Sequence, residues 1–558
     1  MSKFSNKPPL YLPLDFAVVR APLLTVEAYL ALQSEDDQFN LLKDQRALRA
    51  IAAASPSLLS ALTRWQQGSM TKKDADRLSS KLLMYQIRMS TRPTPFGLFA
   101  GCATVSWAED TDLSIRSSFG KSCTRPDLAW LMDLVLEAEA IPEVRQQLCY
   151  VSNPLIRFQG DRVVLSESTP PATSDVPVSL RATGVVKLAI KLARDGIGAA
   201  DLAARIAESS PAATPEKIER LVAQLWEQRI LLTYLRPPLT TDSPASYVLD
   251  RLANIPQAAD VRNKLGLLVK AADAWDRAPH EQSLAVFREL LDSAGCPEDG
   301  SKELPIQVDM ALCVSGHAGH TIGRRAALAA ETLLRLSPTP RGLSHVTAYR
   351  NAFVARYGHE REVPLPELMD PVSGLGPLAG YGGSPVGPDF NKAALRSREL
   401  LQVACSALHQ REKVVRLDEV LLERLETWTR DDSSPPLSLD LNVLIAAQSA
   451  AAIDADEFDL IVGPNLGAWS AGRTFGRFAH LLPPGRDLLE QAIRREEANS
   501  EPDHIWAEVV YLPRKVRAAN VAVRPPLRTY EIAFGISAGV AREFVLRSEE
   551  HTSELQSP

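Results

Sequence analysis

The order of helical and strand patterns is the feature that most constrains the fold of this chain. Helical spacing dominates residues 26–92, whereas short strand patterns dominate from residue 437 onward. We find no internal repeat and no low-complexity tract, which argues against a repeat architecture. The 558 residues exceed what one hydrophobic core supports, and at ~150 residues per packing unit they imply about three or four units. The pattern predicts an α+β protein with several subdomains.

Residues 150–236 form the most clearly delimited unit. The stretch "LIRFQGDRVVLS" predicts a β-hairpin with Gly160 and Asp161 at its turn. Helical patterns follow over residues 182–194 and 198–208. The unit divides the chain into three expected parts, which span residues 1–149, 150–236 and 237–546.

A third helix of this unit starts with Thr214 as its N-cap and Pro215 at its first position. It leads into the strand-like run "RILLTYLRP", and this order of elements suggests a winged helix. Acidic and basic side chains balance along the third helix, which disfavours recognition of duplex DNA. A structural role is open, and so is docking of an extended peptide by strand addition.

Further elements are expected across the rest of the chain. A strand is expected over residues 303–314 and, from residue 437, in "SLDLNVLIAAQ", "FDLIVG", "HIWAEVVYLP", "TYEIAF" and "EFVLRS". The expected helices cover residues 322–336, 344–357, 390–409 and 417–430.

Arginines mark the end of one predicted helix in the stretch "IRMSTRPTPFG". Pro93 disfavours helical geometry at Arg92, so the helix should end at about residues 89–91. Pro95 then keeps the exit extended, and Gly97 permits a turn. The basic residues of this helix and its exit are Lys72, Lys73, Arg77, Lys81, Arg88 and Arg92. One interpretation is a solvated face, and the other is a surface for an anion.

Several common catalytic motifs are missing. The sequence has no GxxxxGK[ST] phosphate loop, no GxSxG elbow, no HExxH and no Rossmann glycine pattern. Cys313, His317 and His320 lie close together in "CVSGHAGHTIG", but no second ligand pair is nearby, so a structural loop is favoured over a metal site. Six widely spaced cysteines without a CxxC pair indicate reduced thiols. With no signal peptide and no apolar run of about 18 residues, a cytoplasmic protein is expected.

Two further clusters of cations occur late in the chain. The stretch "AGRTFGRF" contains Arg473 and Arg477 among glycines. The stretch "LPRKVRAANVAVRPPLR" has no acidic residue and contains Arg514, Lys515, Arg517, Arg524 and Arg528. Because the net charge of the chain is -6, these clusters are local features. They predict an anionic partner, either a nucleic acid backbone or a carboxylated substrate.

At this point a family resemblance becomes visible. "RMSTRPTPFGLFAGCA" closely resembles the most recognisable motif of the class I lanthipeptide (lantibiotic) dehydratases, in their N-terminal glutamylation domain. Agreeing pieces follow in the same order: "FAVVRAPLL", "TRPDLAWL", "QVD", "FVARYGHEREVPLPELMDPVSGLGP", "GRTFGRF" and "RAANVAVRPPLRTYEI". The resemblance covers nearly the whole chain. It implies the lantibiotic-dehydratase N-terminal fold, with the winged-helix unit docking the leader of a precursor peptide.

The resemblance also implies a reaction and its residues. Such enzymes transfer glutamate from glutamyl-tRNA to serine or threonine side chains of a ribosomally made precursor, and a further domain eliminates glutamate to leave dehydroalanine or dehydrobutyrine. Neither a metal nor another cofactor is expected, because the aminoacyl ester is already activated. The residues that match the catalytic positions of the family are Arg20, Arg88, Arg92, Thr94, Asp127, Asp309 and Arg477, with Arg473 as a less favoured match than Arg477. Expected tRNA contacts are Lys72, Lys73, Arg77, Lys81, Arg514, Lys515, Arg517 and Arg524.

Three alternatives stay open. A relative of these enzymes adds an amino acid to a peptide C-terminus from aminoacyl-tRNA, and a non-catalytic scaffold that binds RNA or peptide is a further reading. For the catalytic arginines and aspartates, ion pairs that only hold the domain together, such as Arg88 with Asp127, are the structural alternative. A separate elimination protein, a cyclase, a second copy of the chain and a membrane-bound biosynthetic complex are conceivable partners. Residues 547–558 resemble translated sequencing adapter, so a non-native tail is expected there.

Overall fold

A computed structural model gives the structure of the protein. It describes residues 8–32, 43–165, 178–297, 302–337, 344–363, 365–372, 374–379, 394–430, 435–500 and 504–546. The expected tail at residues 547–558 and the first residues of the helix expected at 390–409 lie outside the described residues.

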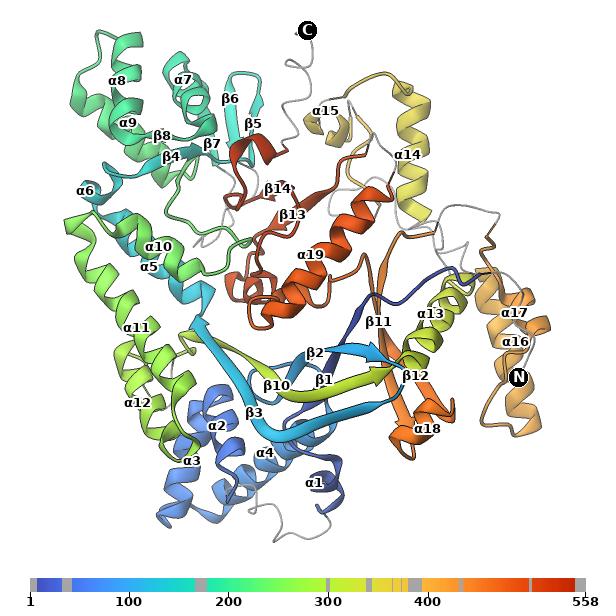
Figure 1. Cartoon of the computed structure of the whole chain (residues 1–558). Coiled ribbons are helices and arrows are strands. Elements are labelled where there is room, and N and C mark those ends of the chain that lie inside the picture. The colour runs from blue at the N-terminus through green and yellow to red at the C-terminus, as the bar shows by residue number, and fades with distance from the viewer. Residues whose placement is uncertain are drawn as a thin grey trace.

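A four-stranded mixed sheet lies at the centre of the fold (Figure 1). Its strand order is β1-β2-β10-β3, formed by β1 (Phe16–Pro22), β2 (Ala100–Ala108), β10 (Ile306–Gly319) and β3 (Asp112–Pro126). Strand β10 is parallel to β2 and antiparallel to β3, and β1 is antiparallel to β2. The sequence predicted β10 but not its three neighbours.

The two faces of this sheet have different environments. Successive side chains of a strand point to opposite faces. Val308 and Met310 belong to a hydrophobic core with α2 (Gln45–Ala54), α3 (Pro56–Gln66), α4 (Lys72–Thr91), α11 (Ala259–Arg277) and α12 (Ser283–Ser293). On the opposite face, Cys102 packs with Phe475, Phe478 and α19 (Pro483–Ala498). Asp309 lies between Val308 and Met310 in sequence, so its side chain points to the face that α19 covers.

Helix α4 ends as its sequence predicts. Thr71 caps the helix by accepting a hydrogen bond from the backbone of Asp74. The last helical residue is Thr91, and Arg92 has extended backbone angles, with φ -112° and ψ 107°. Gly97 has a φ of +53°, the left-handed conformation that glycine adopts without strain. The exit of α4 is therefore fixed by local sequence.

The predicted unit at residues 150–236 has its own hydrophobic core. The predicted hairpin and its three helices are present. The sheets of the unit have the orders β5-β6-β7 and β8-β4-β9. Its elements are β4 (Cys149–Ser152), β5 (Ile156–Gln159), β6 (Arg162–Leu165), β7 (Val178–Arg181), α7 (Gly184–Leu192), η2 (Ala193–Asp195), β8 (Ile197–Gly198), α8 (Ala199–Ser209), α9 (Pro215–Glu227) and β9 (Leu231–Thr233). The winged-helix assignment and the boundaries of the unit stay predictions.

A buried ion pair connects this unit to the rest of the molecule. Glu139, which is fully buried in α5 (Leu128–Ala140), accepts hydrogen bonds from Arg236 at 3.1 and 3.2 Å and from the Thr233 hydroxyl. The pKa of the Glu139 carboxyl is lowered despite burial, because Arg236 and these hydrogen bonds stabilise its charge. This pair fixes the end of β9 against α5.

The remaining elements complete a mixed α+β molecule (Figure 1). The helices are α1 (Val26–Leu30), α6 (Pro142–Arg145), α10 (Pro244–Leu252), η3 (Pro256–Ala258), η4 (His280–Gln282), α13 (His320–Arg335), α14 (Ser344–Tyr357), α15 (Leu365–Met369), α16 (Ala394–Gln410), α17 (Glu419–Leu425), α18 (Ala450–Asp454), η6 (Gly476–Phe478), η7 (Val516–Ala522) and η8 (Arg542–Phe544). Two further sheets pair β11 (Leu439–Ala447) with β12 (Phe458–Trp469), and β13 (Ala507–Tyr511) with β14 (Tyr530–Phe534).

Three expectations about elements were wrong. The "CVSGHAGHTIG" stretch is not a loop, because β10 continues to Gly319 and α13 begins at His320. The expected strand at "EFVLRS" starts as the short helix η8, and only Val545 bridges to β14. Helix α17 is shorter than the predicted 417–430. Pairing with β3 carries β10 through this stretch, although Gly316 has a φ of +90°, and local sequence does not reveal that pairing.

Candidate active site

The central sheet brings polar residues from distant parts of the sequence into one row. Arg20 on β1 lies opposite Cys102 on β2, and Asp309 on β10 lies opposite Cys123 on β3. Arg125 is two residues beyond Cys123, so it shares a face with Asp309. This face is the one that the residues around η6 cover.

Asp309 is the anionic centre of this row. Its side chain is 2% exposed, its Oδ1 lies 2.5 Å from Nη2 of Arg477, and its Oδ2 lies 3.6 Å from Nη2 of Arg125. Arg477 comes from η6, and its guanidinium also lies over the ring of Phe478 at 4.5 Å. The buried carboxylate therefore holds two guanidinium groups from two different segments.

Arg20 adds a third guanidinium to the row. Its Nη2 donates to the backbone carbonyl of Thr474 at 2.8 Å. Burial lowers the pKa of Arg20, the nearby Arg477 acts in the same direction, and Asp440 opposes both. Burial also raises the pKa of the Cys102 thiol to about 12, so this thiol is protonated and unreactive at neutral pH.

Arg125 connects Asp309 to two other segments. Its Nη2 donates to the backbone carbonyl of Asn520 at 2.8 Å, and its Nη1 lies 3.4 Å from Nε2 of His480. Burial lowers the pKa of His480 to about 4, and Arg125 adds to this effect. The imidazole is thus neutral at pH 7, and Nε2 is the acceptor because a guanidinium can only donate.

Asp127 lies at the other end of this network. Its Oδ1 caps α5 by accepting from the backbone of Ala129 and Trp130 at 3.0 and 3.2 Å. Its Oδ2 accepts from Nδ2 of Asn520 at 2.6 Å and lies 3.4 Å from Nε of Arg517. The side chain is 2% exposed, and burial raises the pKa of its carboxyl above the usual value. The ion-pair partner of Asp127 is therefore Arg517, not Arg88.

Arg88, Arg92 and Thr94 form a second, more exposed group. Arg92 and Thr94 are exposed, and Arg88 is partly buried with its guanidinium 4.8 Å above the ring of Phe96. Burial lowers the pKa of Arg88, and the charge of Arg92 lowers it further, so the two guanidinium groups influence each other directly. Within the described part of the chain, neither arginine forms an ion pair with a carboxylate. Two adjacent guanidinium groups without an acidic partner suit an anion.

The structure thus joins some predicted residues and leaves others apart. Arg20, Asp309 and Arg477 are in one cluster, and Arg125 and Asn520 connect this cluster to Asp127. Arg88, Arg92 and Thr94 form no hydrogen bond with those side chains among the described residues. Helix α4 adjoins the segment that follows β1, because the backbone N–H of Leu24 donates to the carbonyl of Met89 at 2.8 Å.

Sequence reasoning missed Arg125, His480 and Asn520. Each lies next to a recognised motif, in "TRPD", "GRFAH" and "RAANVAV". No local pattern marked Arg125, because β3 becomes a strand only through its register with β10. The hydrogen bond of Asn520 to Asp127 spans 393 residues and has no local signal.

The expected tRNA contacts differ in availability. Lys72, Lys73, Lys81, Arg514 and Lys515 are exposed, and Arg77 is an exposed residue 3.8 Å from Asp74. By contrast, Nε of Arg524 lies 2.6 Å from Glu508, and Nε of Arg517 lies 3.0 Å from Glu303. The geometry therefore gives Arg517 and Arg524 internal roles, and they are poor candidates for phosphate contacts.

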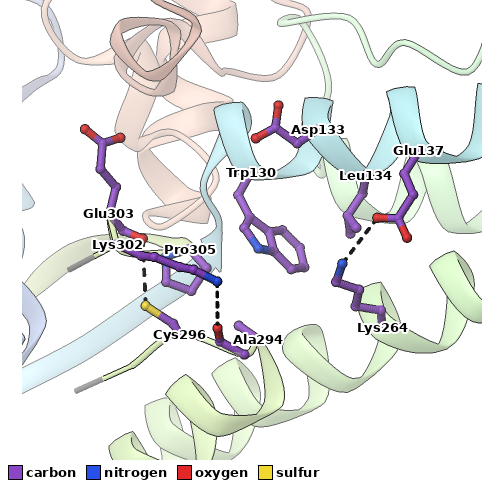
Figure 2. A pocket seen from close by; sticks show the side chains of 11 residues that line it. Trp130, Asp133, Leu134, Glu137, Lys264, Ala294, Cys296, Lys302, Glu303 and Pro305 are labelled. Atoms are coloured by element: carbon purple, nitrogen blue, oxygen red, sulfur yellow. Dashed lines mark hydrogen bonds and ion pairs between the residues drawn. The ribbon is translucent and has the colours of Figure 1, made fainter. Parts of the chain in front are cut away.

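The described residues enclose two cavities near this part of the fold. One, of about 240 Å³, lies along α5 and is lined by Trp130, Asp133, Leu134, Glu137, Lys264, Ala294, Gly295, Cys296, Lys302, Glu303 and Pro305. Figure 2 shows Trp130 between α5 and the segment with Lys302 and Glu303. The other, of about 540 Å³, includes Ser90 near the end of α4. Neither cavity is lined by a predicted catalytic residue.

The metal hypothesis gains no support from geometry. His317 lies 3.2 Å from Asp110, and no group of three or more His, Cys, Asp or Glu side chains within the described ranges is arranged to hold a metal ion. The described residues also contain no helix that is long and apolar enough to cross a bilayer.

Sequence comparison identifies a family and relatives. The sequence model of the family described as lantibiotic dehydratase, N terminus, matches residues 43–547. The subtilin biosynthesis protein SpaB of Bacillus subtilis is 26% identical, and the match covers 97% of this chain and 52% of SpaB. The nisin biosynthesis protein NisB of Lactococcus lactis subsp. lactis is 22% identical over 86% of this chain and 48% of NisB. The chain spans about half the length of the curated relatives it matches.

Structural comparison agrees with this result. The crystal structure of the tRNA dependent lantibiotic dehydratase MibB from Microbispora sp. 107891 matches with a TM-score of 0.83 and 29% identity, covering 96% of this chain and 52% of MibB. The glutamylation domain TbtB from thiomuracin biosynthesis matches with a TM-score of 0.60 and 18% identity, covering 92% of this chain and 63% of TbtB. The second match supports the fold alone.

Proposed function

The chain belongs to the lantibiotic dehydratase family, and we propose that it transfers glutamate from glutamyl-tRNA to serine or threonine side chains of a precursor peptide. The observation that carries this proposal is the pair Arg88 and Arg92. Arg88 lies in the last turn of α4, and Arg92 is its C-cap. Burial lowers the pKa of Arg88, the charge of Arg92 lowers it further, and neither arginine has an acidic partner among the described residues. MibB is described as tRNA dependent, and the TbtB structure as a glutamylation domain.

The transfer is an exchange of one ester for another. The side-chain hydroxyl of the peptide attacks the glutamyl carbonyl and loses its proton. The ester bond to the tRNA ribose then breaks, and the departing ribose oxygen takes up a proton to become a hydroxyl. An oxyanion develops on the carbonyl during the attack, and donors positioned for this charge lower the barrier. Arg88, Arg92 and the hydroxyl of Thr94 are the donors proposed for this role.

In this proposal the buried aspartates position other residues and do not react with substrate. The carboxylates of Asp127 and Asp309 bind internal donors and are each 2% exposed, so neither is available to take a proton from substrate. Asp309 instead holds Arg477 and Arg125, and Asp127 holds Arg517 and the start of α5. We therefore assign positioning roles to both carboxylates, in place of direct proton transfer.

The partners follow from the same chemistry. The exposed cations Lys72, Lys73 and Lys81 of α4, with Arg514 and Lys515, are proposed to contact tRNA phosphates. The unit with α7, α8 and α9 is proposed to dock the leader of the precursor by adding a strand to a sheet edge. No cofactor is proposed, because the aminoacyl ester already carries the activation energy.

A reconstituted transfer assay tests the proposal. Glutamyl-tRNA with labelled glutamate is incubated with the protein and a Ser/Thr-rich precursor peptide, and the peptide is analysed by mass spectrometry. We expect glutamate esters that mild base removes, and no product when free glutamate replaces glutamyl-tRNA. An amide-linked amino acid at the peptide C-terminus would instead identify an aminoacyl-tRNA ligase, and no modified peptide would contradict both activities.

A further inference from the structure

The loop between β12 and η6 is held in place by one side chain of β11. Asp440 accepts hydrogen bonds from the backbone N–H of Gly472 at 2.8 Å, from the backbone N–H of Thr474 at 2.8 Å and from the Thr474 hydroxyl at 2.8 Å. Gly472 has a φ of +83°, and a Cβ atom there would lie 2.1 Å from the side chain of Leu489. The loop therefore has one tightly specified conformation.

The same loop is tied from its other side to the cluster of Arg20, Asp309 and Arg477. The carbonyl of Thr474 accepts a hydrogen bond from Arg20 at 2.8 Å, and the charge of Asp440 also acts on Arg20. The backbone from Gly472 to Thr474 is thus clamped between β11 and β1. The one residue between them is Arg473.

Arg473 and Arg477 differ in what they can contact. Arg477 lies 2.5 Å from the buried Asp309, so a substrate would have to compete with that carboxylate. Arg473 is exposed, and its guanidinium has no hydrogen-bond or ion-pair partner within the described part of the chain. The loop thus presents a guanidinium from a fixed backbone, next to a cluster of other cations.

We propose that Arg473 binds a phosphate group of the tRNA and that Asp440 is the positioning residue that presents it. A guanidinium matches phosphate oxygens through paired N–H groups, and a fixed backbone reduces the ordering needed on binding. The proposal rests on the proposed use of glutamyl-tRNA, and it assigns Arg477 to internal support and Arg473 to ligand contact.

Binding of uncharged tRNA specific for glutamate, measured by fluorescence anisotropy at several salt concentrations, tests this assignment. Uncharged tRNA contains the phosphates but no glutamyl carboxylate, so it isolates the phosphate contact. We expect Arg473→Gln to weaken binding about tenfold at low salt and to reduce the slope of log K against log salt by about 1. Asp440→Asn should change both quantities in the same direction, since the amide has a single acceptor atom and cannot accept from both Gly472 and Thr474.

Matched controls and a double variant separate positioning from general damage. Arg205→Gln and Asp459→Asn change exposed residues that belong neither to the loop nor to the cluster of Arg20, Asp309 and Arg477, and both should leave affinity and salt slope unchanged. If Asp440 acts through Arg473, the double variant should bind no more weakly than Arg473→Gln alone. Wild-type affinity and slope for Arg473→Gln, with intact binding by the wild-type protein, would overturn this inference alone. Failure of the wild-type protein to bind tRNA would overturn it together with the proposed function.

Discussion

At the scale of single residues, Asp309 has the clearest energetic role. It is 2% exposed and is the carboxylate that faces both Arg477 and Arg125. Replacing one partner of a buried ion pair leaves the other partners buried without compensation, at a cost of about 3 kcal/mol or more. The arrangement of Arg477 should therefore depend on this one carboxylate.

We predict that Asp309→Asn lowers the free energy of unfolding by about 3 kcal/mol, because two guanidinium groups lose their counter-charge. Chemical denaturation measures this change. The exposed Asp459→Asn provides a control with the same change of charge. If Asp309→Asn were as stable as that control, the ion pairs of Asp309 would not support the fold.

At the scale of elements, local sequence determines some parts of the fold and long-range pairing determines others. The helices of residues 45–91 were predictable, because each begins with a capping side chain: Asp44, Ser55 and Thr71. Strand β3 was not predictable, because "DLSIRSSFGKSCTRP" is polar and becomes a strand through its register with β10. Strands β1 and β2 likewise form by pairing with each other over a long sequence separation, which local sequence does not reveal.

The candidate site also combines residues that local sequence reveals with partners that only the fold brings close. Its arginines and aspartates were found through motifs that resemble a known family, and each motif lies on one local segment. The partners of these residues could not be found in that way. Asp309 and Arg477 are 168 residues apart, and Arg125 and Asn520 are 395 residues apart. The reassignment of Arg517 and Arg524 to internal ion pairs has the same cause, because their acidic partners are on other segments.

Sheet β13–β14 contains a carboxyl pair that should make stability depend on pH. Glu531 is fully buried and lies opposite Glu508 in the strand register. Burial is the largest cause that raises the pKa of Glu531, and Glu508 raises it further. A carboxyl with a raised folded-state pKa stabilises the fold at low pH, and this stabilisation is lost as pH rises through the folded-state pKa.

We therefore predict that Glu531→Gln is more stable than the wild-type protein at pH 7–8, and that the difference shrinks toward pH 4. Glutamine keeps an acceptor for the backbone N–H of Gly539, which donates to Glu531 at 2.9 Å. Denaturation curves at several pH values measure the difference. The exposed Glu423→Gln is the control. A difference that is constant over this pH range would show that Glu531 does not titrate as described.

At the scale of the whole molecule, the surface charge of α4 should govern association with tRNA. The chain has a net charge of -6, so binding of a polyanion must use local clusters. We predict that replacing Lys72, Lys73 and Lys81 by Gln reduces the slope of log K for tRNA binding against log salt concentration by up to about 3. Each phosphate contact contributes about 1 to this slope. The same number of substitutions at exposed lysines of other helices, Lys187, Lys217 and Lys270, should leave the slope unchanged if α4 lies on the tRNA path.

The central claim concerns Arg88 and Arg92, and the most direct measurement is the single-turnover rate of glutamate transfer from glutamyl-tRNA to peptide. Loss of one positioned donor costs about 3 kcal/mol of transition-state stabilisation, roughly a hundredfold in rate. Arg92→Lys keeps the charge but loses the paired N–H groups, so it should be impaired as well. We predict that Arg88→Ala and Arg92→Lys reduce the rate at least about a hundredfold, with thermal stability and tRNA affinity close to wild type. Near-normal transfer by either folded variant would contradict the account and would indicate that the replaced arginine has only a structural role.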